Sequence, residues 1–445
     1  MALAQNIEES PRRFLPNRSV LLVAQSQEKA DSFVSQLRLR GFSPVVSIFN
    51  GERLQGIPRQ APDAIVICLS NNNLRVKAIN QALKARYEGK SVPIIGIFDG
   101  YAEIPNSGFD SVLFEPVHPN QVVHRISAMI RLTIMQTEMA MRMETLQQDF
   151  NIDYRLNPKA FDDSLKVLFI GKATPEFMVI INALEQKNVE VIAAFTSFTA
   201  FDFLHETTFD AVVINALDDM EPGLSISKTM RKNTALYHTP SLLLSQKGKI
   251  ADDVAFEHGV SDILFSEASE KDIQDRILEL AKFHRLHRQV KAEFENLGQA
   301  ECMDESGTYS NRFFSKHLNR LISTYSAQDL PVSILTIQAE FDGETPPDTE
   351  TEDLALNQLG AIIKNMVRVY DVTARLSKNI YVIAFPGQPA SRLTPVVTRL
   401  SSIPKTTRFG RTDSGAQSYN FKLALDLAEL GHGVTGESWL AQNLD

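Results

Sequence analysis

Cysteine is scarce in this chain, and long apolar runs are absent. The 445 residues include two cysteines, Cys68 and Cys302, which lie far apart and outside any metal-ligand spacing. This excludes a disulfide framework and is typical of a reducing compartment. No stretch reaches the roughly 18 consecutive apolar residues of a membrane-spanning helix. The start, MALAQNIEESPRRFLPN, lacks the apolar core of a signal peptide. We therefore expect a cytoplasmic protein without membrane insertion.

Positive charge is also limited. The sequence has 45 Lys and Arg against 54 Asp and Glu, a formal net charge of −9. This provides no general attraction to nucleic acid or to an anionic membrane, and we expect no nucleic-acid partner. Hydrophobic residues make up 43% and charged residues 22%, as in ordinary globular proteins. The length exceeds what one hydrophobic core supports, so we expect about three domains.

A pattern of short apolar runs occurs twice in the first two thirds of the chain. Val20 and Val167, and likewise Asp63 and Asp210, are separated by 147 residues. The matched runs are SVLLVAQ (19–25) with LKVLFIG (165–171), PDAIVIC (62–68) with FDAVVIN (209–215), VPIIGIF (92–98) with TPSLLLS (239–245), and GFDSVLFEP (108–116) with GVSDILFSE (259–267). A constant offset across separate strands indicates a duplication.

These runs do not alternate with polar residues, as expected of parallel strands buried on both faces. Segments with helical spacing lie between them, such as EKADSFVSQLRLRG (28–41) and PEFMVIINALEQKN (175–188). Regular alternation of strand and helix predicts two doubly wound α/β domains, at 17–148 and 163–297. Both domains resemble the receiver domain of two-component signalling.

The resemblance to receivers implies a phosphorylation site that both copies lack. A working receiver needs carboxylates for Mg²⁺ after its first strand, an acceptor Asp after the third, and Ser or Thr and Lys after the fourth and fifth. The corresponding residues are Ala24, Gln25, Cys68, Phe98 and Glu115 in the first copy and Gly171, Lys172, Asn215, Ser245 and Ser266 in the second. Since Cys68 and Asn215 replace the acceptor, we expect two degenerate receivers used for packing, dimerisation or partner docking.

Helical spacing predicts two long helices, at 119–150 and 270–297, that lead out of the receivers. The first carries a methionine-rich stripe, which serves either to fill a core or to bind a partner. The second carries His284 and His287 at a spacing that suits a metal. Without a third ligand nearby, a solvated helix face is the expectation.

Three segments of the remaining chain resemble a GGDEF domain, the module of diguanylate cyclases that condenses two GTP into cyclic di-GMP. These segments are MDESGTYSNRFF (303–314), in which Asp304, Asn311 and Arg312 match; PVSILTIQAEFD (331–342), which matches a strand; and RVYDVTARLSKNIYVIAF (368–385). We predict a mixed α/β, degenerate GGDEF domain at 300–445. FGRTDSGAQ (409–417) is interpreted as a hairpin turn and Trp439 as a packing anchor.

The resemblance implies a catalytic site that needs two metal ions on carboxylates and a Gly-Gly turn close to the nucleotide. Gln338 replaces the first strand carboxylate, although Glu340 remains at the second. Ser377, Lys378 and Asn379 replace the glycines and acids of the signature loop. The chain also ends before the family's closing helix and strand. We therefore expect no catalytic residue, no bound metal or cofactor, and no enzyme activity.

Arg368 and Asp371 match the Arg-x-x-Asp of the family's inhibitory site, where cyclic di-GMP binds as a stacked pair. The arginine can fork onto a phosphate or onto guanine O6 and N7, and the aspartate can accept from guanine N1 and N2. Arg399 lies at the position of a further arginine of that site. The alternative is an exposed ion pair at a helix end.

The order receiver–receiver–GGDEF resembles that of PleD-type cyclases and of their PopA-like paralogues. The second resemblance implies a catalytically inactive, homodimeric cyclic di-GMP effector located at a cell pole. There it would recruit the adaptor RcdA and the cell-cycle regulator CtrA for proteolysis by ClpXP. Two alternatives stay open: a nucleotide-independent dimeric scaffold, and a weak, residual diguanylate cyclase.

Overall fold

The computed structural model describes residues 18–51, 54–69, 73–98, 108–155, 164–249, 252–298, 302–343, 348–410, 419–431 and 434–443. The chain divides into two compact units, Met1–Thr133 with Pro158–Gln289, and Ile134–Asn157 with Val290–Asp445. The first unit contains two largely parallel sheets, and the second contains one mixed sheet. No helix in the described ranges is long and apolar enough to cross a membrane.

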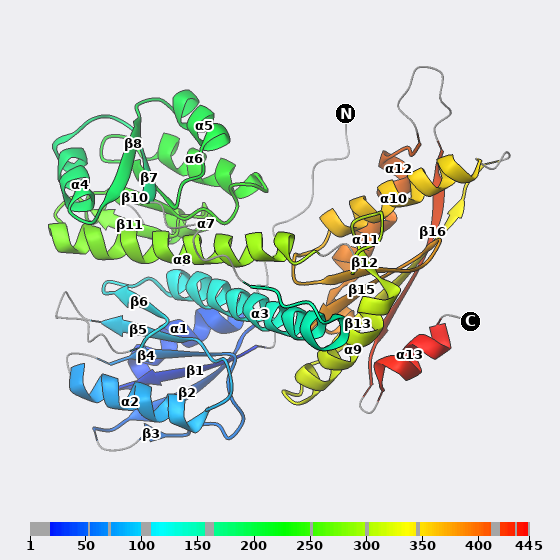
Figure 1. The fold of residues 1–445 in the computed structure, drawn as a ribbon. Helices are drawn as coiled ribbons and strands as arrows, with labels where there is room; N and C mark the ends of the chain where they lie inside the picture. Colours follow the sequence, from blue (N-terminus) through cyan, green and yellow to red (C-terminus); the bar gives the residue numbers. More distant parts are fainter. Residues whose placement is uncertain are drawn as a thin grey trace. The chain divides into compact units, whose positions relative to one another are not determined.

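The first sheet has the order β3-β2-β1-β4-β5-β6, in which all strands except β3 are parallel. Its strands are β1 (Ser19–Ala24), β2 (Ser43–Phe49), β3 (Leu54–Gln55), β4 (Ala64–Cys68), β5 (Ile94–Phe98) and β6 (Ser111–Phe114). Helix α2 (Asn73–Arg86) covers one face, and α1 (Gln27–Leu39) with the first half of α3 (Pro119–Phe150) covers the other (Figure 1). Without β3, this is the strand order of flavodoxin-like doubly wound sheets.

The crossover from β2 to β4 differs from the predicted alternation of strand and helix. Its described residues form no helix, and β3 pairs antiparallel with β2 instead. Gly51 and Gly56 adopt positive φ angles of 97° and 77°, and Pro58 and Pro62 follow within the same segment. Glycine and proline both disfavour a helix interior, so this crossover folds as an irregular connection.

The second sheet repeats the same strand order, β11-β10-β9-β7-β8, and is entirely parallel. Its strands are β7 (Leu165–Ile170), β8 (Val189–Ala194), β9 (Ala211–Asn215), β10 (Ser241–Ser245) and β11 (Asp262–Phe265), and its helices are α4 (Pro175–Glu185), α5 (Ser197–Glu206), α6 (Glu221–Lys232), α7 (Asp252–Glu257) and α8 (Glu270–Asn296). Helices α4 and α8 pack on one face, and α5, α6 and α7 on the other. The predicted pair of doubly wound, receiver-like folds is confirmed.

Asp63 and Asp210 make the same contact in the two copies. Asp63 Oδ2 accepts the N–H of Ser19 at 2.7 Å, and Asp210 Oδ2 accepts the N–H of Lys166 at 2.8 Å. Each aspartate precedes the third strand of its fold and holds the start of the first strand. The shared contact explains why this aspartate recurs in both halves of the repeat.

The two receiver folds contact each other inside the first unit. Helix α8 covers the edge strand β6, where Glu279 Oε1 accepts the Ser111 hydroxyl at 2.8 Å and the Val112 N–H at 3.0 Å. Arg276 Nη2 donates to the carbonyl of Phe114 at 2.8 Å. An exposed strand edge is prone to pair with other chains, and this contact covers it.

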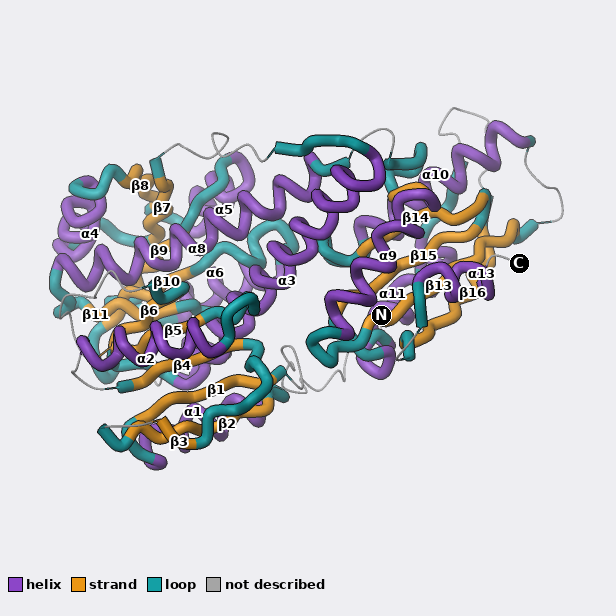
Figure 2. Tube along the Cα trace, turned by 60° about the horizontal axis from the view of Figure 1, so that its bottom comes forward, coloured by secondary structure: helices purple, strands orange, loops and turns teal. Residues whose placement is uncertain are grey.

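The third sheet has the order β12-β14-β15-β13-β16, and β13 is antiparallel to both its neighbours (Figure 2). Its strands are β12 (Tyr309–Ser310), β13 (Val332–Phe341), β14 (Val372–Ser377), β15 (Ile380–Pro386) and β16 (Phe421–Glu429), and its helices are α9 (Asn311–Ser326), α10 (Thr349–Asn365), α11 (Thr394–Ser401), α12 (Ile403–Thr406) and α13 (Gly436–Asn443). Helices α10, α11 and α12 share one core with β13 and β15. This is the mixed α/β fold expected of a GGDEF-like domain.

The two long predicted helices are present as α3 and α8. Met129, Met135 and Met139 of α3 are buried, which confirms that they fill the core. The expectation of a solvated face is wrong for His284 of α8, which is only 5% exposed. Its Nδ1 lies 3.2 Å from the carbonyl oxygen of Asp210, because this face of α8 packs against the start of β9.

Two smaller expectations concern the C-terminal region. Trp439 is buried, and its ring centroid lies 6.5 Å from that of Phe314, so its packing role is confirmed. Phe409 and Tyr419 form an antiparallel bridge. Residues 411–418, which include most of the predicted hairpin turn, lie outside the described residues.

Replacing Asp210 by alanine should destabilise the second receiver fold by about 3–5 kcal/mol. The carboxylate is fully buried and lies 2.5 Å from Arg285 and 3.2 Å from Arg288, so its loss leaves two cations without their acid. Chemical denaturation followed by circular dichroism measures the change. The control Asp218→Ala removes an exposed ion pair with Lys172 and should leave the unfolding transition nearly unchanged. Equal effects would contradict the role of Asp210.

Candidate ligand-binding site

Arg368 and Asp371 form a closed turn between α10 and β14. Asp371 Oδ2 accepts the N–H of Arg368 at 2.9 Å, and the N–H of Asp371 donates to the carbonyl of Arg368 at 3.0 Å. Helix α10 ends with its C-cap at Met366, and β14 begins at Val372. The turn therefore makes up most of the connection between the helix and the strand. The Arg-x-x-Asp spacing lets the carboxylate reach back to the first residue of the turn.

The Asp371 carboxyl group is buried but only partly hydrogen bonded. It is 7% exposed, and its Oδ1 accepts no hydrogen bond from the described residues. Burial raises the pKa of this carboxyl to about 6, although Arg368 and Arg142 favour its charged form. An unpartnered buried acceptor is costly in free energy, and a ligand that donates a hydrogen bond to it would remove that cost.

Two exposed arginines lie at the same turn. The guanidinium of Arg368 lies over the ring of Tyr370, with its Cζ 5.6 Å from the ring centroid. Arg399, on α11, donates from Nη2 to the carbonyl of Met366 at 2.5 Å. The structure thus brings together the three residues that the sequence predicts for ligand binding, Arg368, Asp371 and Arg399.

A buried arginine that the sequence analysis did not single out holds this turn in place. Arg142, in the second half of α3, donates from Nη2 to the carbonyl of Asp371 at 3.3 Å and from Nε to Glu138 Oε1 at 2.8 Å. Its Cζ also lies 4.7 Å from the ring centroid of Phe294 and 5.2 Å from that of Tyr309. The position of the turn therefore depends on α3.

Glu138 is the acid that balances Arg142. It is fully buried, and its Oε1 also lies 2.9 Å from Nε2 of the buried His317 of α9. Burial alone would raise the pKa of the Glu138 carboxyl, but His317 and Arg142 outweigh it and hold the pKa below its usual value. Two charges four residues apart within an apolar helix were the available sequence clue.

The loop that the sequence analysis compares with the GGDEF signature, Ser377-Lys378-Asn379, is a tight hairpin between β14 and β15. Lys378 Nζ lies 2.7 Å from Glu352 and 3.3 Å from Asp353, both on α10. Asn379 Nδ2 donates to a backbone carbonyl of β13 at 3.1 Å. Polar contacts with α10 and β13 thus hold the loop in place, and Lys378 pairs with the two acids of α10 that lie nearest to it.

The two strand positions that the sequence analysis compares with the metal-binding carboxylates of the GGDEF family are exposed. Gln338 and Glu340 lie on the exposed side of β13, opposite Ile380 and Lys422 in the neighbouring strands. Within the described residues, no three His, Cys, Asp or Glu side chains converge as ligands for a metal ion.

Cys68 and Asn215, at the positions expected for a phosphoacceptor, both contact their own folds. Cys68 is buried at the end of β4, beside Ala24 of β1. Asn215 Nδ2 donates to the carbonyl of Lys172 at 3.1 Å, and Asn215 Oδ1 accepts the N–H of Leu217 at 3.1 Å. An ionised aspartate could not donate the first of these bonds, so the amide suits this loop better than the acid.

No protein-family model and no curated protein sequence matches the chain. Among solved structures, a response regulator from Chloroflexus aurantiacus is similar, with 19% identity and a TM-score of 0.26, over 27% of this chain and 99% of that one. The FimX GGDEF domain from Pseudomonas aeruginosa is similar over 32% of this chain and 87% of that one, with 16% identity and a TM-score of 0.28. The GGDEF domain of DgcB from Caulobacter crescentus, in complex with c-di-GMP, is similar over 32% and 84%, with 12% identity and a TM-score of 0.27.

Replacing Arg142 by methionine should destabilise the second unit by about 3–5 kcal/mol, because the buried Glu138 then loses one of its two charge partners. The double variant Glu138→Gln/Arg142→Met should recover most of this loss, since it buries no net charge. Denaturant unfolding of the full chain, followed at the transition of the second unit, measures both effects. If Arg142→Met lowered the free energy of unfolding by less than about 1 kcal/mol, the prediction would be contradicted, because the Glu138–Arg142 pair would then contribute little to stability.

Proposed function

We propose that the chain is a cyclic di-GMP receptor that binds the dinucleotide at Arg368, Asp371 and Arg399 and makes none itself. The observation that carries the proposal is the buried Asp371 carboxyl, whose Oδ1 has no hydrogen-bond partner among the described residues. It lies in the same turn as one exposed arginine, and a second exposed arginine contacts the residue that caps the preceding helix.

Cyclic di-GMP supplies the groups that this turn lacks. A guanine edge presents the N1–H and N2–H donors, which an ionised Asp371 accepts as a pair. Its opposite edge presents O6 and N7, and the two phosphates carry negative charge; both suit the planar donor fork of Arg368 or Arg399. A dinucleotide with two guanines and two phosphates can therefore engage the acid and both arginines at once.

We expect no catalysis, because the residues at the positions of the family's active site lack the chemistry that the reaction needs. The loop that would approach a substrate carries Lys378 in place of glycine, and this side chain pairs with Glu352 and Asp353. Gln338 cannot supply the negative charge that a metal-bridging carboxylate provides. The receivers, with Cys68 and Asn215 at the acceptor positions, act in this proposal as packing and docking modules.

The resemblance to PopA-like receptors extends the proposal to a cellular role. The ligand-bound chain would be a homodimer, formed through its receivers, at a cell pole. There it would recruit RcdA and CtrA for cell-cycle-dependent proteolysis by ClpXP. Recruitment of the partner should then require the same arginines that bind the ligand.

Two rival functions predict different outcomes in simple assays. A nucleotide-independent scaffold would show no heat of binding with cyclic di-GMP and would dimerise equally well without it. A residual cyclase would convert GTP to cyclic di-GMP with Mg²⁺ or Mn²⁺, and Glu340→Ala would remove that activity. Calorimetry and GTP turnover on the purified full chain therefore separate the three functions.

Arg368→Ala should weaken cyclic di-GMP binding about 30- to 1,000-fold, because a charge-assisted hydrogen bond to a desolvated ligand is lost. Lys378→Ala is the matched control, since it removes another exposed cation of the same domain and should change affinity by less than about threefold. Titration calorimetry measures both affinities. Thermal unfolding without ligand should be nearly unchanged in Arg368→Ala, because its side chain is exposed. The reverse ranking would place the ligand in the former catalytic loop.

Cyclic di-GMP affinity should rise about tenfold between pH 5 and pH 7 and then level off. Burial raises the pKa of Asp371 to about 6, and only the ionised carboxyl accepts both guanine donors. Below this pKa the ligand must displace a proton, so binding weakens as the pH falls. Calorimetry at several pH values gives the profile. Asp371→Asn should bind weakly and without this pH dependence; a flat profile in the unmodified chain contradicts the contact.

A further inference from the structure

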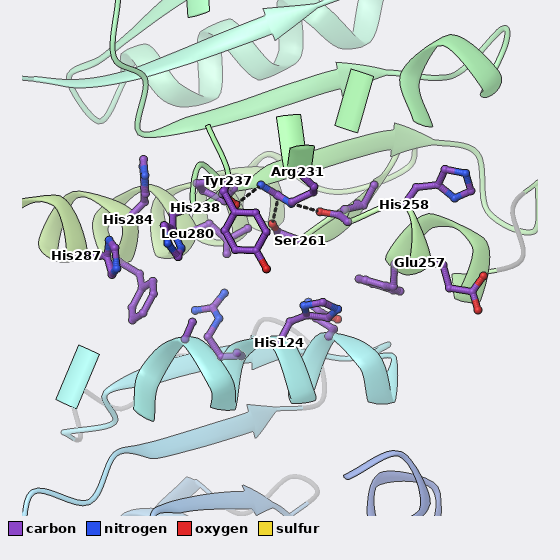
Figure 3. A pocket seen from close by; sticks show the side chains of 18 of the residues that line it. His124, Arg231, Tyr237, His238, Glu257, His258, Ser261, Leu280, His284 and His287 are labelled. Atoms are coloured by element: carbon purple, nitrogen blue, oxygen red, sulfur yellow. Dashed lines mark hydrogen bonds between the residues drawn. The ribbon is translucent and has the colours of Figure 1, made fainter. Parts of the chain in front are cut away.

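A cavity of about 790 Å³ lies inside the first unit, where the two receiver folds face each other. Helix α3 of the first fold forms one wall, and α6, α7 and α8 of the second form the others (Figure 3). Its volume is within the range of about 300–1,000 Å³ that small-molecule and nucleotide sites occupy. None of the residues assigned above to cyclic di-GMP lines it.

Both receiver folds contribute cations to this cavity. The lining arginines and lysines are Arg40, Arg125 and Arg131 from the first fold and Lys228, Arg231 and Lys232 from the second. Glu257 is the single carboxylate among the described lining residues. Arg125 lies 3.4 Å from Glu279 of α8, so part of this positive charge is balanced beside the cavity. An anion bound between the two folds would be attracted by cations of both.

Arg231 is held at the cavity wall by neutral acceptors. Its Nε donates to the carbonyl of Gly259 at 2.8 Å, and Nη1 donates to the carbonyls of Tyr237 and Thr239, each at 2.8 Å. Nη2 donates to the hydroxyls of Ser241 and Ser261, at 3.2 and 3.3 Å. All five N–H donors of Arg231 are thus used within the second fold, and because every acceptor is neutral, the charge of the guanidinium still favours an anion in the cavity.

The imidazole of His124 lies on the α3 wall of the same cavity, close to several arginines. Burial lowers the pKa of His124 to about 4, and Arg40, Arg231 and Arg131 lower it further by their charge. Figure 3 shows His124 on α3 opposite Tyr237 and Arg231, with the space of the cavity between them.

We propose that this cavity binds a small ligand with several phosphoryl groups, either a nucleoside polyphosphate or an inorganic polyphosphate, and that the ligand joins the two receiver folds. The positive charge on both walls favours clustered phosphates, and Lys228 and Lys232 can donate to phosphate oxygens. Tyr237 and the histidine rings offer flat surfaces for a base. The site is separate from the cyclic di-GMP site and does not depend on it.

The test is titration calorimetry of the full chain, without divalent metal, against tripolyphosphate, ATP and GTP. The unmodified chain should bind at least one of them, and binding should weaken as salt is added. The variant Lys228→Gln/Lys232→Gln removes two exposed lining charges and should weaken binding about tenfold. The matched control Lys187→Gln/Lys247→Gln removes two exposed lysines of the same fold outside the cavity and should leave it unchanged.

The outcomes separate the ligand sources and the sites. Equal affinity for tripolyphosphate and the nucleotides identifies an inorganic polyphosphate, and tighter binding of one nucleotide identifies a nucleotide; both support the site. Absence of binding by all three probes overturns it, as does equal weakening in the control variant. Arg368→Ala should bind the best probe as the unmodified chain does. A loss there, with binding intact in Lys228→Gln/Lys232→Gln, assigns the probe to the cyclic di-GMP site and also overturns the proposal.

Discussion

The buried pair of Glu138 and Arg142 is the interaction on which the candidate site depends. Both charges are removed from water, which is tolerable only because each has a close partner of opposite sign or a hydrogen bond. Arg142 also donates to the carbonyl of Asp371, while Glu138 contacts His317 of α9. One helix that leaves the first receiver fold therefore supports the Arg-x-x-Asp turn directly. A ligand that moves this turn must move, or strain, the pair beneath it.

The residues that depart from the receiver and GGDEF patterns in the sequence differ physically from the Arg-x-x-Asp turn that matches the pattern. Lys378 pairs with acids of α10, and Asn215 hydrogen bonds to the backbone on both sides of its amide. These groups are satisfied within the fold and leave little for a ligand to gain. Asp371 keeps a buried oxygen without a partner among the described residues. A ligand that donates a hydrogen bond to this oxygen would remove the free-energy cost of leaving it unpartnered. The satisfied groups of the other positions offer no such gain, and this contrast supports the proposed binding site rather than a catalytic one.

The sequence predicted most of the fold because the repeat and the apolar runs are local patterns. Strands such as β4 and β9 are short, apolar and bounded by turn residues, so their type is clear without tertiary information. The crossover after β2 was missed, because two glycines and two prolines outweighed the expected alternation of strand and helix. His284 was misplaced because its burial depends on which face of α8 meets the sheet. Arg142 was missed for the same reason: its partners lie far away in the sequence.

The net charge of the chain predicts its long-range attraction to nucleic acid. It does not predict the charge that surrounds a single cavity. A total of −9 argues against a surface that attracts nucleic acid, since that attraction sums over the whole molecule. Within a cavity, screening is weaker and the nearest charges dominate. Six cations from two folds can therefore face one enclosed space in an acidic protein. The duplication itself allows this arrangement, because two similar folds can retain the same core while their contact surfaces acquire different charges.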